Sequence, residues 1–220
     1  PRLLNGVSVW EKPAKFYLSL AVHTATLNWG LMLLAPSERT APAIRRTALI
    51  AAIAAVGEMI WITLQAARGQ ASHFNDTAAM YQIMYALMGA GAVTLTGITI
   101  YLGFRILTRG NGIATYAAGT GFILAGILTT AVAGYLSQQT GHAVGGDATD
   151  ASGLPFFHWS TTGGDLRVAH FAALHVAQAI PFLAWIWPDR RIINLGLFAS
   201  VVIVGALLAQ AMAGIPFLRA

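Results

Sequence analysis

Residues 192–217 read IINLGLFASVVIVGALLAQAMAGIPF, a stretch of 26 residues without a charged side chain. A helix of about 20 predominantly apolar residues is long enough to cross the hydrocarbon core of a bilayer. Five further apolar stretches precede this one, at 16–35, 48–67, 78–107, 114–136 and 166–187. The chain is therefore predicted to be all-α: an integral membrane bundle of about six transmembrane helices, with residues 1–220 forming a single transmembrane domain.

The composition supports a membrane protein and argues against other classes. Hydrophobic residues make up 56% of the chain and charged residues only 10%, whereas a soluble domain is roughly one quarter charged. The net charge of +5 does not indicate a nucleic-acid partner, because the basic residues flank the apolar stretches and form no continuous face. Such residues are typical of interface anchors.

Two further absences narrow the chemistry and the processing of the chain. There is no cysteine, which excludes disulfides, thiolate metal sites and a cysteine nucleophile. Before residue 15 there is no charged segment followed by a short apolar run and a small-residue cleavage site. We therefore expect no cleavable signal peptide.

One connection is unusually long and rich in aromatic residues. Residues 137–165 separate the fourth and fifth apolar stretches and contain Phe156, Phe157 and Trp159. A disordered tether lacks such residues, so we expect a structured loop that folds back over the bundle. Both termini are predicted to lie on the same side of the membrane as this loop.

Basic residues favour one orientation of the bundle. The connections on the side opposite the long loop carry most of the arginines, which favours the cytoplasm for that side. We therefore expect a multi-pass protein of a bacterial inner membrane with its long loop outside the cytoplasm. These arginines are Arg39, Arg45, Arg46, Arg105, Arg109, Arg190 and Arg191.

Ionisable residues inside apolar stretches indicate a candidate site, because they are costly in lipid. His23, Glu58 and His175 each lie eight to ten residues from the expected boundary on the long-loop side. At a rise of 1.5 Å per residue, these positions correspond to depths of about 12–15 Å. We therefore predict that the three side chains converge in one layer, where they could ligate a metal ion.

Helical spacing extends the predicted site. On the fifth stretch, Arg167, His170, His175 and Gln178 fall within an arc of about 140°. Trp61 shares a helix face with Glu58, and Tyr85 lies near the same depth. The predicted catalytic residues are Glu58, His175, His170 and Arg167. The predicted cofactor-binding residues are His23, His175, Trp61, Tyr85 and Gln178.

Three functions fit these residues. The favoured one binds a b-type haem or a divalent metal for a redox or metal-assisted reaction, because imidazole and carboxylate groups ligate both. The second is a proton-coupled small-solute transporter or channel. The third is a non-catalytic membrane subunit or assembly factor. The residues leave open whether the protein is an enzyme. The expected partners are the lipid bilayer and, further, other membrane subunits or copies of this chain.

Overall fold

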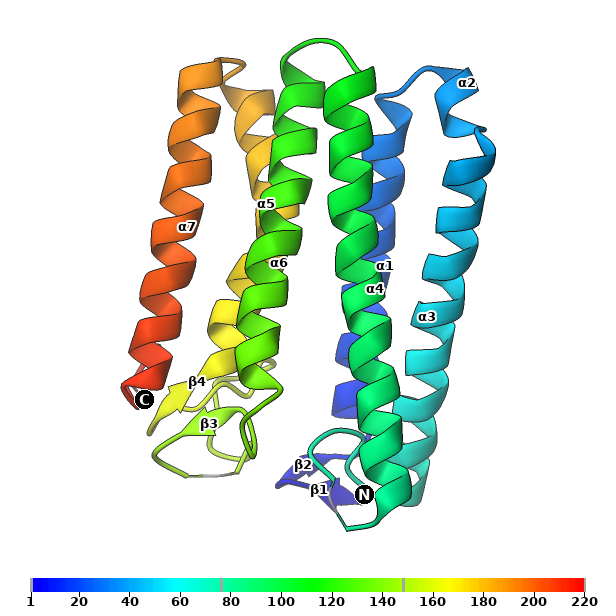
Figure 1. Cartoon of the computed structure of the whole chain (residues 1–220). Helices are drawn as coiled ribbons and strands as arrows, with labels where there is room; N and C mark the ends of the chain where they lie inside the picture. The colour runs from blue at the N-terminus through cyan, green and yellow to red at the C-terminus, as the bar shows by residue number, and fades with distance from the viewer. Residues whose placement is uncertain (1, 76, 148, 220) are drawn as a thin grey trace.

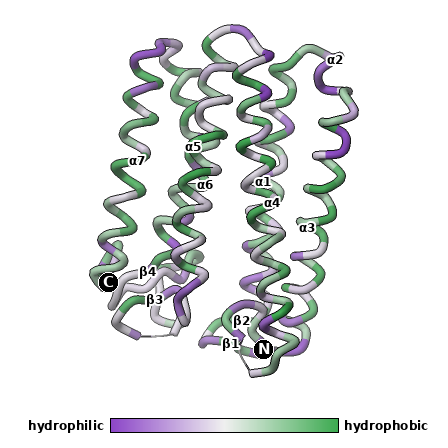
Figure 2. Tube along the Cα trace, in the orientation of Figure 1, coloured by the Kyte–Doolittle hydropathy of each residue, from purple (hydrophilic) through white to green (hydrophobic). Residues whose placement is uncertain are grey.

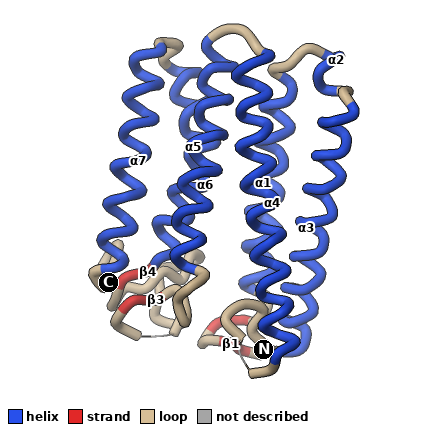
Figure 3. Tube along the Cα trace, viewed as in Figure 1, coloured by secondary structure: helices blue, strands red, loops and turns tan. Residues whose placement is uncertain are grey.

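The computed structural model describes residues 2–75, 77–147 and 149–219. Within these ranges it contains seven helices and four two-residue strands (Figures 1 and 3). The helices are α1 (Glu11–Met32), α2 (Pro36–Arg39), α3 (Pro42–Arg68), α4 (Ala79–Arg109), α5 (Ile113–Leu136), α6 (Leu166–Ile186) and α7 (Arg190–Met212). The strands are β1 (Leu3–Leu4), β2 (Val7–Ser8), β3 (Ala143–Val144) and β4 (Gly164–Asp165).

The six long helices run side by side and reverse direction at each connection (Figure 1). One end of the bundle, the turn face, holds the short connections 33–41, 110–112 and 187–189. The other end, the loop face, holds both chain ends, the connection 69–78 and the long loop 137–165. The all-α architecture and the structured long loop predicted from the sequence are confirmed.

Five of the described helices, α3 to α7, are long and apolar enough to cross a membrane. Hydrophilic residues gather toward the two ends of the bundle, and hydrophobic residues dominate its middle (Figure 2). Helix α1 has a similar length but carries His23, Thr26 and Asn28 in its central part. The chain is therefore a multi-pass membrane protein in which the first helix is the most polar.

Local chemistry sets the helix boundaries. Helix α3 starts with Pro42 at its first position, where the missing N–H costs nothing. It ends at Gly69, whose φ of 69° is left-handed and favours glycine. Helix α6 starts after Asp165, whose side chain accepts a hydrogen bond from the backbone N–H of Arg167. This is ordinary N-terminal capping.

Three predicted boundaries differ from the structure by five residues or more. Helix α3 begins at Pro42, six residues before its apolar stretch. Helix α1 begins at Glu11, five residues before the apolar stretch, because its charged first turn lies at the loop face outside the apolar layer. Helix α7 ends at Met212 and does not reach residue 217. Gly214 adopts a left-handed φ of 72° and Pro216 follows it, and both disfavour continuation of a helix.

The long helices pack closely where glycines remove side chains. Helices α4 and α5 are neighbours, as are α5 and α6, and α6 and α7, while α1 lies against α3, α4 and α5. A Cβ atom placed on Gly103 would lie 2.8 Å from the carbonyl oxygen of Gly119. Small residues at this contact therefore let the backbones of α4 and α5 approach each other.

Close apolar contacts join α1, α4 and α5 near the turn face. Phe122 of α5 and Ile106 of α4 are fully buried. A Cβ atom on Gly30 of α1 would lie 2.6 Å from the Phe122 ring and 3.0 Å from Ile106. These three residues, which we term the apolar plug, belong to the largest buried hydrophobic cluster or lie directly against it.

Aromatic contacts hold the long loop against the bundle. The Phe157 ring stacks on Trp159 with a centroid separation of 4.4 Å, and both rings contact Phe171 of α6. Trp159 also contacts Phe217 after α7. Strands β3 and β4 pair with each other and join the two ends of the loop. The predicted packing of the aromatic segment on the loop face is therefore present.

Candidate functional site

A hydrogen bond between α6 and α1 fixes the level of the two helices. The Gln178 side-chain amide donates to the Thr26 hydroxyl over 2.9 Å. Both helices run from the loop face toward the turn face (Figure 1). Residues at equal offsets from this pair therefore lie at about the same level, so His23 and His175, each three residues earlier, share a level.

The same geometry places His23 and His175 on opposite sides of the contact. At about 100° per residue, each lies about 60° around its helix from the bonded pair, in the same rotational sense. Because the helices are parallel and face each other, equal rotations point the two rings apart. His175 stacks on Phe171 at a centroid separation of 3.9 Å, and its Nδ1 lies 2.8 Å from the Phe171 carbonyl oxygen.

His170 lies on the side of His23. It precedes Gln178 by eight residues, which turns it about 80° in the sense opposite to His175. Its Nδ1 is fully buried and has no hydrogen-bond partner among the described residues. The interior imidazoles are therefore His170 and His23, and the ring of His175 lies outside this pair.

His23 is oriented by a threonine on α4. Its Nε2 lies 3.2 Å from Thr99 Oγ1, and the same hydroxyl donates to the Leu95 carbonyl over 2.9 Å. Because a hydroxyl has one proton, Thr99 accepts from the His23 Nε2–H. The lone pair of His23 Nδ1 is then left available to a ligand.

Two more buried polar atoms face this interior without a partner in the described part of the chain: Gln178 Oε1 and Thr129 Oγ1. Thr129 follows Phe122 on α5 by seven residues, which brings it to within about 20° of the same helix face. A Cβ atom on Gly121 would lie 3.0 Å from Ile180. Helices α5 and α6 are antiparallel, so the step from Gly121 to Thr129 on α5 corresponds to an equal step from Ile180 toward His170 on α6. Thr129 is therefore level with residues close to His170.

We term these residues the interior polar cluster. Its members come from α1, α4, α5 and α6, lie on the loop-face side of the apolar plug, and extend over about 12 Å along the bundle axis, since His170 and Gln178 are eight residues apart on α6. Buried polar groups are normally paired, and unpaired ones are especially costly in a membrane. The cluster is therefore suited to hold a group that supplies the missing partners. Its members are His23, Thr26, Thr99, Thr129, His170 and Gln178.

Glu58 lies at a different level from His23. A Cβ atom on Gly91 of α4 would lie 3.3 Å from Glu58 Oε1, whereas His23 contacts Thr99 of the same helix. Gly91 and Thr99 are eight residues apart, about 12 Å along the helix axis. The depth estimate from sequence assumed that the loop-face ends of all helices lie at one height. The loop-face ends of α1 and α3 lie at different heights (Figure 1).

The structure consequently does not gather His23, Glu58 and His175 into one ligand set. Among the described residues there is no group of three or more His, Asp or Glu side chains placed to hold a metal ion. Only His23 of the three belongs to the interior polar cluster.

Three other predicted site residues anchor loops. The Trp61 indole N–H donates to the Ser72 carbonyl over 3.1 Å, and the Tyr85 hydroxyl donates to the Ser137 carbonyl over 3.3 Å. Arg167 pairs with Asp165 at 2.7 Å and with Asp150 at 2.9 Å. These contacts hold the connections 69–78 and 137–165 on the loop face.

Charged groups of the loop face are largely paired with one another. Asp150 contacts Arg167 and also His142 at 3.3 Å. Burial alone would raise the pKa of Asp150, but the His142 ring and the Arg167 guanidinium hold that pKa well below its usual range. His158 lies 3.6 Å from Glu11 of α1. This network fixes the long loop to α1 and α6.

Lys12 and His73 form a contact that the sequence reasoning missed. Lys12 Nζ lies 3.0 Å from His73 Nδ1, and the His73 ring lies 5.9 Å from that of Phe16. Burial, followed by the charge of Lys12, lowers the pKa of His73 to about 3. Burial, followed by the charge of Arg167, lowers the pKa of Lys12 to about 8. No spacing links residues from two separate segments, so the sequence carried no signal for this pair.

Comparisons of the chain with models of known families, with curated proteins and with solved structures find no match. The functional assignment therefore depends on the geometry of the interior polar cluster.

Proposed function

We propose that this chain is a membrane protein that binds a small ligand or cofactor within the bundle, on the loop-face side of the apolar plug, with His170 and His23 as its principal ligating groups. The observation that carries the proposal is the buried Nδ1 of His170, which has no partner among the described residues. His23 supplies a second imidazole on the same side. Gln178 and Thr129 add unpaired oxygen atoms.

The donor set favours a b-type haem over a bare divalent ion. A protein-held divalent ion uses three or more side-chain ligands, and the described residues offer no such group. A haem iron can be held by one or two imidazoles, and His170 and His23 would hold it here. A bound haem would supply one-electron redox chemistry, and these residues would ligate it, orient it and exclude water from it.

A second candidate is proton-coupled movement of a small solute. Glu58 supports it, because its carboxyl group faces Gly91 and makes no hydrogen bond with the described residues. The apolar plug also supports it, because closely packed apolar residues between the interior polar cluster and the turn face would block passage until they move apart.

The visible absorption spectrum and the iron content of the purified full chain test the first candidate. We expect a Soret band, a reduced-minus-oxidised difference spectrum and about one iron per chain. His170→Ala removes the chromophore, and His23→Ala removes or weakens it. His175→Ala is the matched control, because its ring is on the outer side of the same helix, and it keeps the chromophore.

One outcome contradicts the haem proposal, and another contradicts its assignment of the ligating residues. One is a colourless, iron-free wild-type protein, after which solute uptake by proteoliposomes tests the second candidate. The other is a chromophore that is lost in His175→Ala and kept in His170→Ala, which would reverse the assignment of the interior side of α6.

A further inference from the structure

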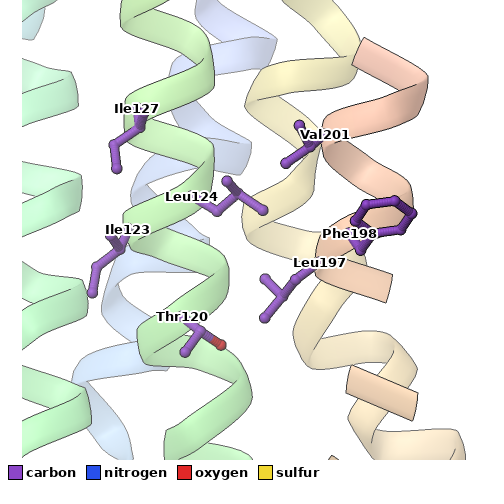
Figure 4. Close-up of a pocket in the computed structure, with 7 residues that line it drawn as sticks. All are labelled: Thr120, Ile123, Leu124, Ile127, Leu197, Phe198 and Val201. Carbon is purple, nitrogen blue, oxygen red and sulfur yellow. The ribbon is translucent and has the colours of Figure 1, made fainter. Parts of the chain in front are cut away.

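A groove on the outer surface of the bundle lies between α5 and α7, outside the interior polar cluster (Figure 4). It has a volume of about 310 Å³ and is almost entirely apolar. Phe198 is 67% exposed beside it, and both helices are candidate membrane spans. The residues that line it are Thr120, Ile123, Leu124, Ile127, Leu197, Phe198 and Val201.

Thr120, the polar residue of this lining, is already satisfied. Its hydroxyl donates to the carbonyl oxygen of Tyr116 in its own helix over 2.7 Å. The groove therefore offers an apolar surface and no group that would bind a polar ligand. An alkyl chain matches that surface.

The turn-face end of the groove is polar and basic. The Tyr116 hydroxyl donates to Asn194 Oδ1 over 2.6 Å, and the Arg190 guanidinium lies over the Tyr116 ring, 4.5 Å from its centroid. Tyr116 precedes Thr120 by four residues, so this polar group lies about 6 Å beyond the groove lining. Arg191 is adjacent in sequence and exposed.

Among the described residues, no acidic side chain forms an ion pair with Arg190 or Arg191. Asp189 is the only acidic residue in the segment 180–220, and α5 has none. The Asp189 carboxylate caps α7 by accepting from the backbone N–H groups of Arg191 at 2.6 Å and Ile192 at 3.4 Å. The two guanidinium groups are therefore available to an anion at the membrane interface.

We propose that this groove binds an anionic phospholipid, with one acyl chain along α5 and α7 and the phosphate-bearing headgroup at Arg190 and Arg191. The groove is apolar where the acyl chain would lie and positively charged where the anionic headgroup would lie. Guanidinium groups bind phosphate oxygens in a bidentate manner, and basic pockets between membrane helices bind anionic headgroups. Tyr116 fixes Arg190 through its ring face.

Native mass spectrometry of the full chain tests the headgroup site, with phosphatidylglycerol and phosphatidylcholine of matched acyl chains as the added lipids. We expect wild-type protein to retain phosphatidylglycerol roughly tenfold more tightly than phosphatidylcholine. The double variant Arg190→Gln/Arg191→Gln should retain the two lipids equally. The matched control Arg45→Gln/Arg46→Gln removes two arginines from the start of α3 on the same face and should keep the preference.

A second pair of variants tests the acyl-chain site independently of the headgroup. Val201→Trp fills the groove and should weaken retention of both lipids, whereas Val202→Trp, at the exposed neighbouring position, should not. Equal binding of both lipids by the wild type overturns the proposal, as does loss of the preference in the α3 control. A dimer that Val201→Trp dissociates would also overturn it, because a second copy would then occupy the groove. None of these results depends on a cofactor in the bundle.

Discussion

Gln178 of α6 and Thr26 of α1 form a 2.9 Å hydrogen bond between two helices that are separated by most of the chain. The bond fixes the contact between the two helices. The positions of His23 and His170 along their helices, counted from this contact, turn both imidazoles toward the interior. Its loss should loosen the contact of α1 with the remaining helices.

A double-mutant cycle measures that contribution. Thr26→Val and Gln178→Leu each remove one partner, and the coupling between them should be about 0.6 kcal/mol, the average for hydrogen bonds between membrane helices. Reversible unfolding in mixed micelles supplies the free energies. A coupling indistinguishable from zero would show that the bond does not tie α1 to α6.

The close packing of the apolar plug predicts that one added methyl group lowers the stability of the folded protein. Gly30→Ala places a Cβ atom 2.6 Å from the edge of the buried Phe122 ring, so we expect a loss of about 1–3 kcal/mol from overpacking. Gly57→Ala is the matched control, since no atom lies within 4 Å of its added Cβ. It should be neutral or stabilising, as alanine is the better helix former. Equal effects of the two changes would contradict the packing of Gly30 on the plug.

The Lys12–His73 contact predicts a loss of stability in acid. Because the pKa of His73 falls from 6.5 to about 3 on folding, the unfolded chain binds more protons between these values. The contribution of neutral His73 is complete above about pH 6.5 and is lost as the pH falls toward 3. The thermal midpoint of the wild type should therefore drop between pH 7 and pH 5.

His73→Gln tests this assignment, because glutamine does not titrate and still offers an oxygen to Lys12. Its thermal midpoint should depend less on pH in the same interval than that of the wild type. Parallel curves for the wild type and His73→Gln would mean that a different group titrates.

Apolar length and the flanking charges were sufficient to predict the bundle, since both follow from the solvent that the helices meet. The level and phase of the polar residues were not predictable in the same way. Helix α1 starts at Glu11, and α3 and α4 extend beyond it at the loop face (Figure 1). An estimate that counts residues from each boundary therefore placed Glu58 and His23 in one layer.

The sequence alone also could not predict which side of α6 faces the interior. His170 and His175 both belong to the polar arc of that helix, and periodicity alone gives them equal status. The bond from Gln178 to Thr26 separates them. Thr99 and Thr129 carried no signal, because a threonine in a membrane helix usually bonds to its own backbone.

Glu58 provides the prediction that separates the two candidate functions. It is buried on α3 next to Gly91, and its level differs from that of His23 by about 12 Å along α4. An intramembrane carboxyl group without a partner is costly and marks a functional position. If the protein moves protons with a solute, Glu58→Gln should lower uptake into proteoliposomes at least tenfold while leaving any chromophore intact. Gly91→Ala, which adds a methyl group 3.3 Å from Oε1, should lower uptake less.

If Glu58→Gln instead removes the chromophore, as His170→Ala does, the carboxyl group and the interior polar cluster serve one site despite the difference in level between Glu58 and His23. Gln65→Leu controls for a general loss of polarity on α3, because Gln65 is buried on the same helix and its side chain, among the described residues, bonds to Ala71 of the connection that follows and to Arg68. Unchanged uptake and an unchanged spectrum in Glu58→Gln would leave Glu58 as a packing contact of α3 on α4.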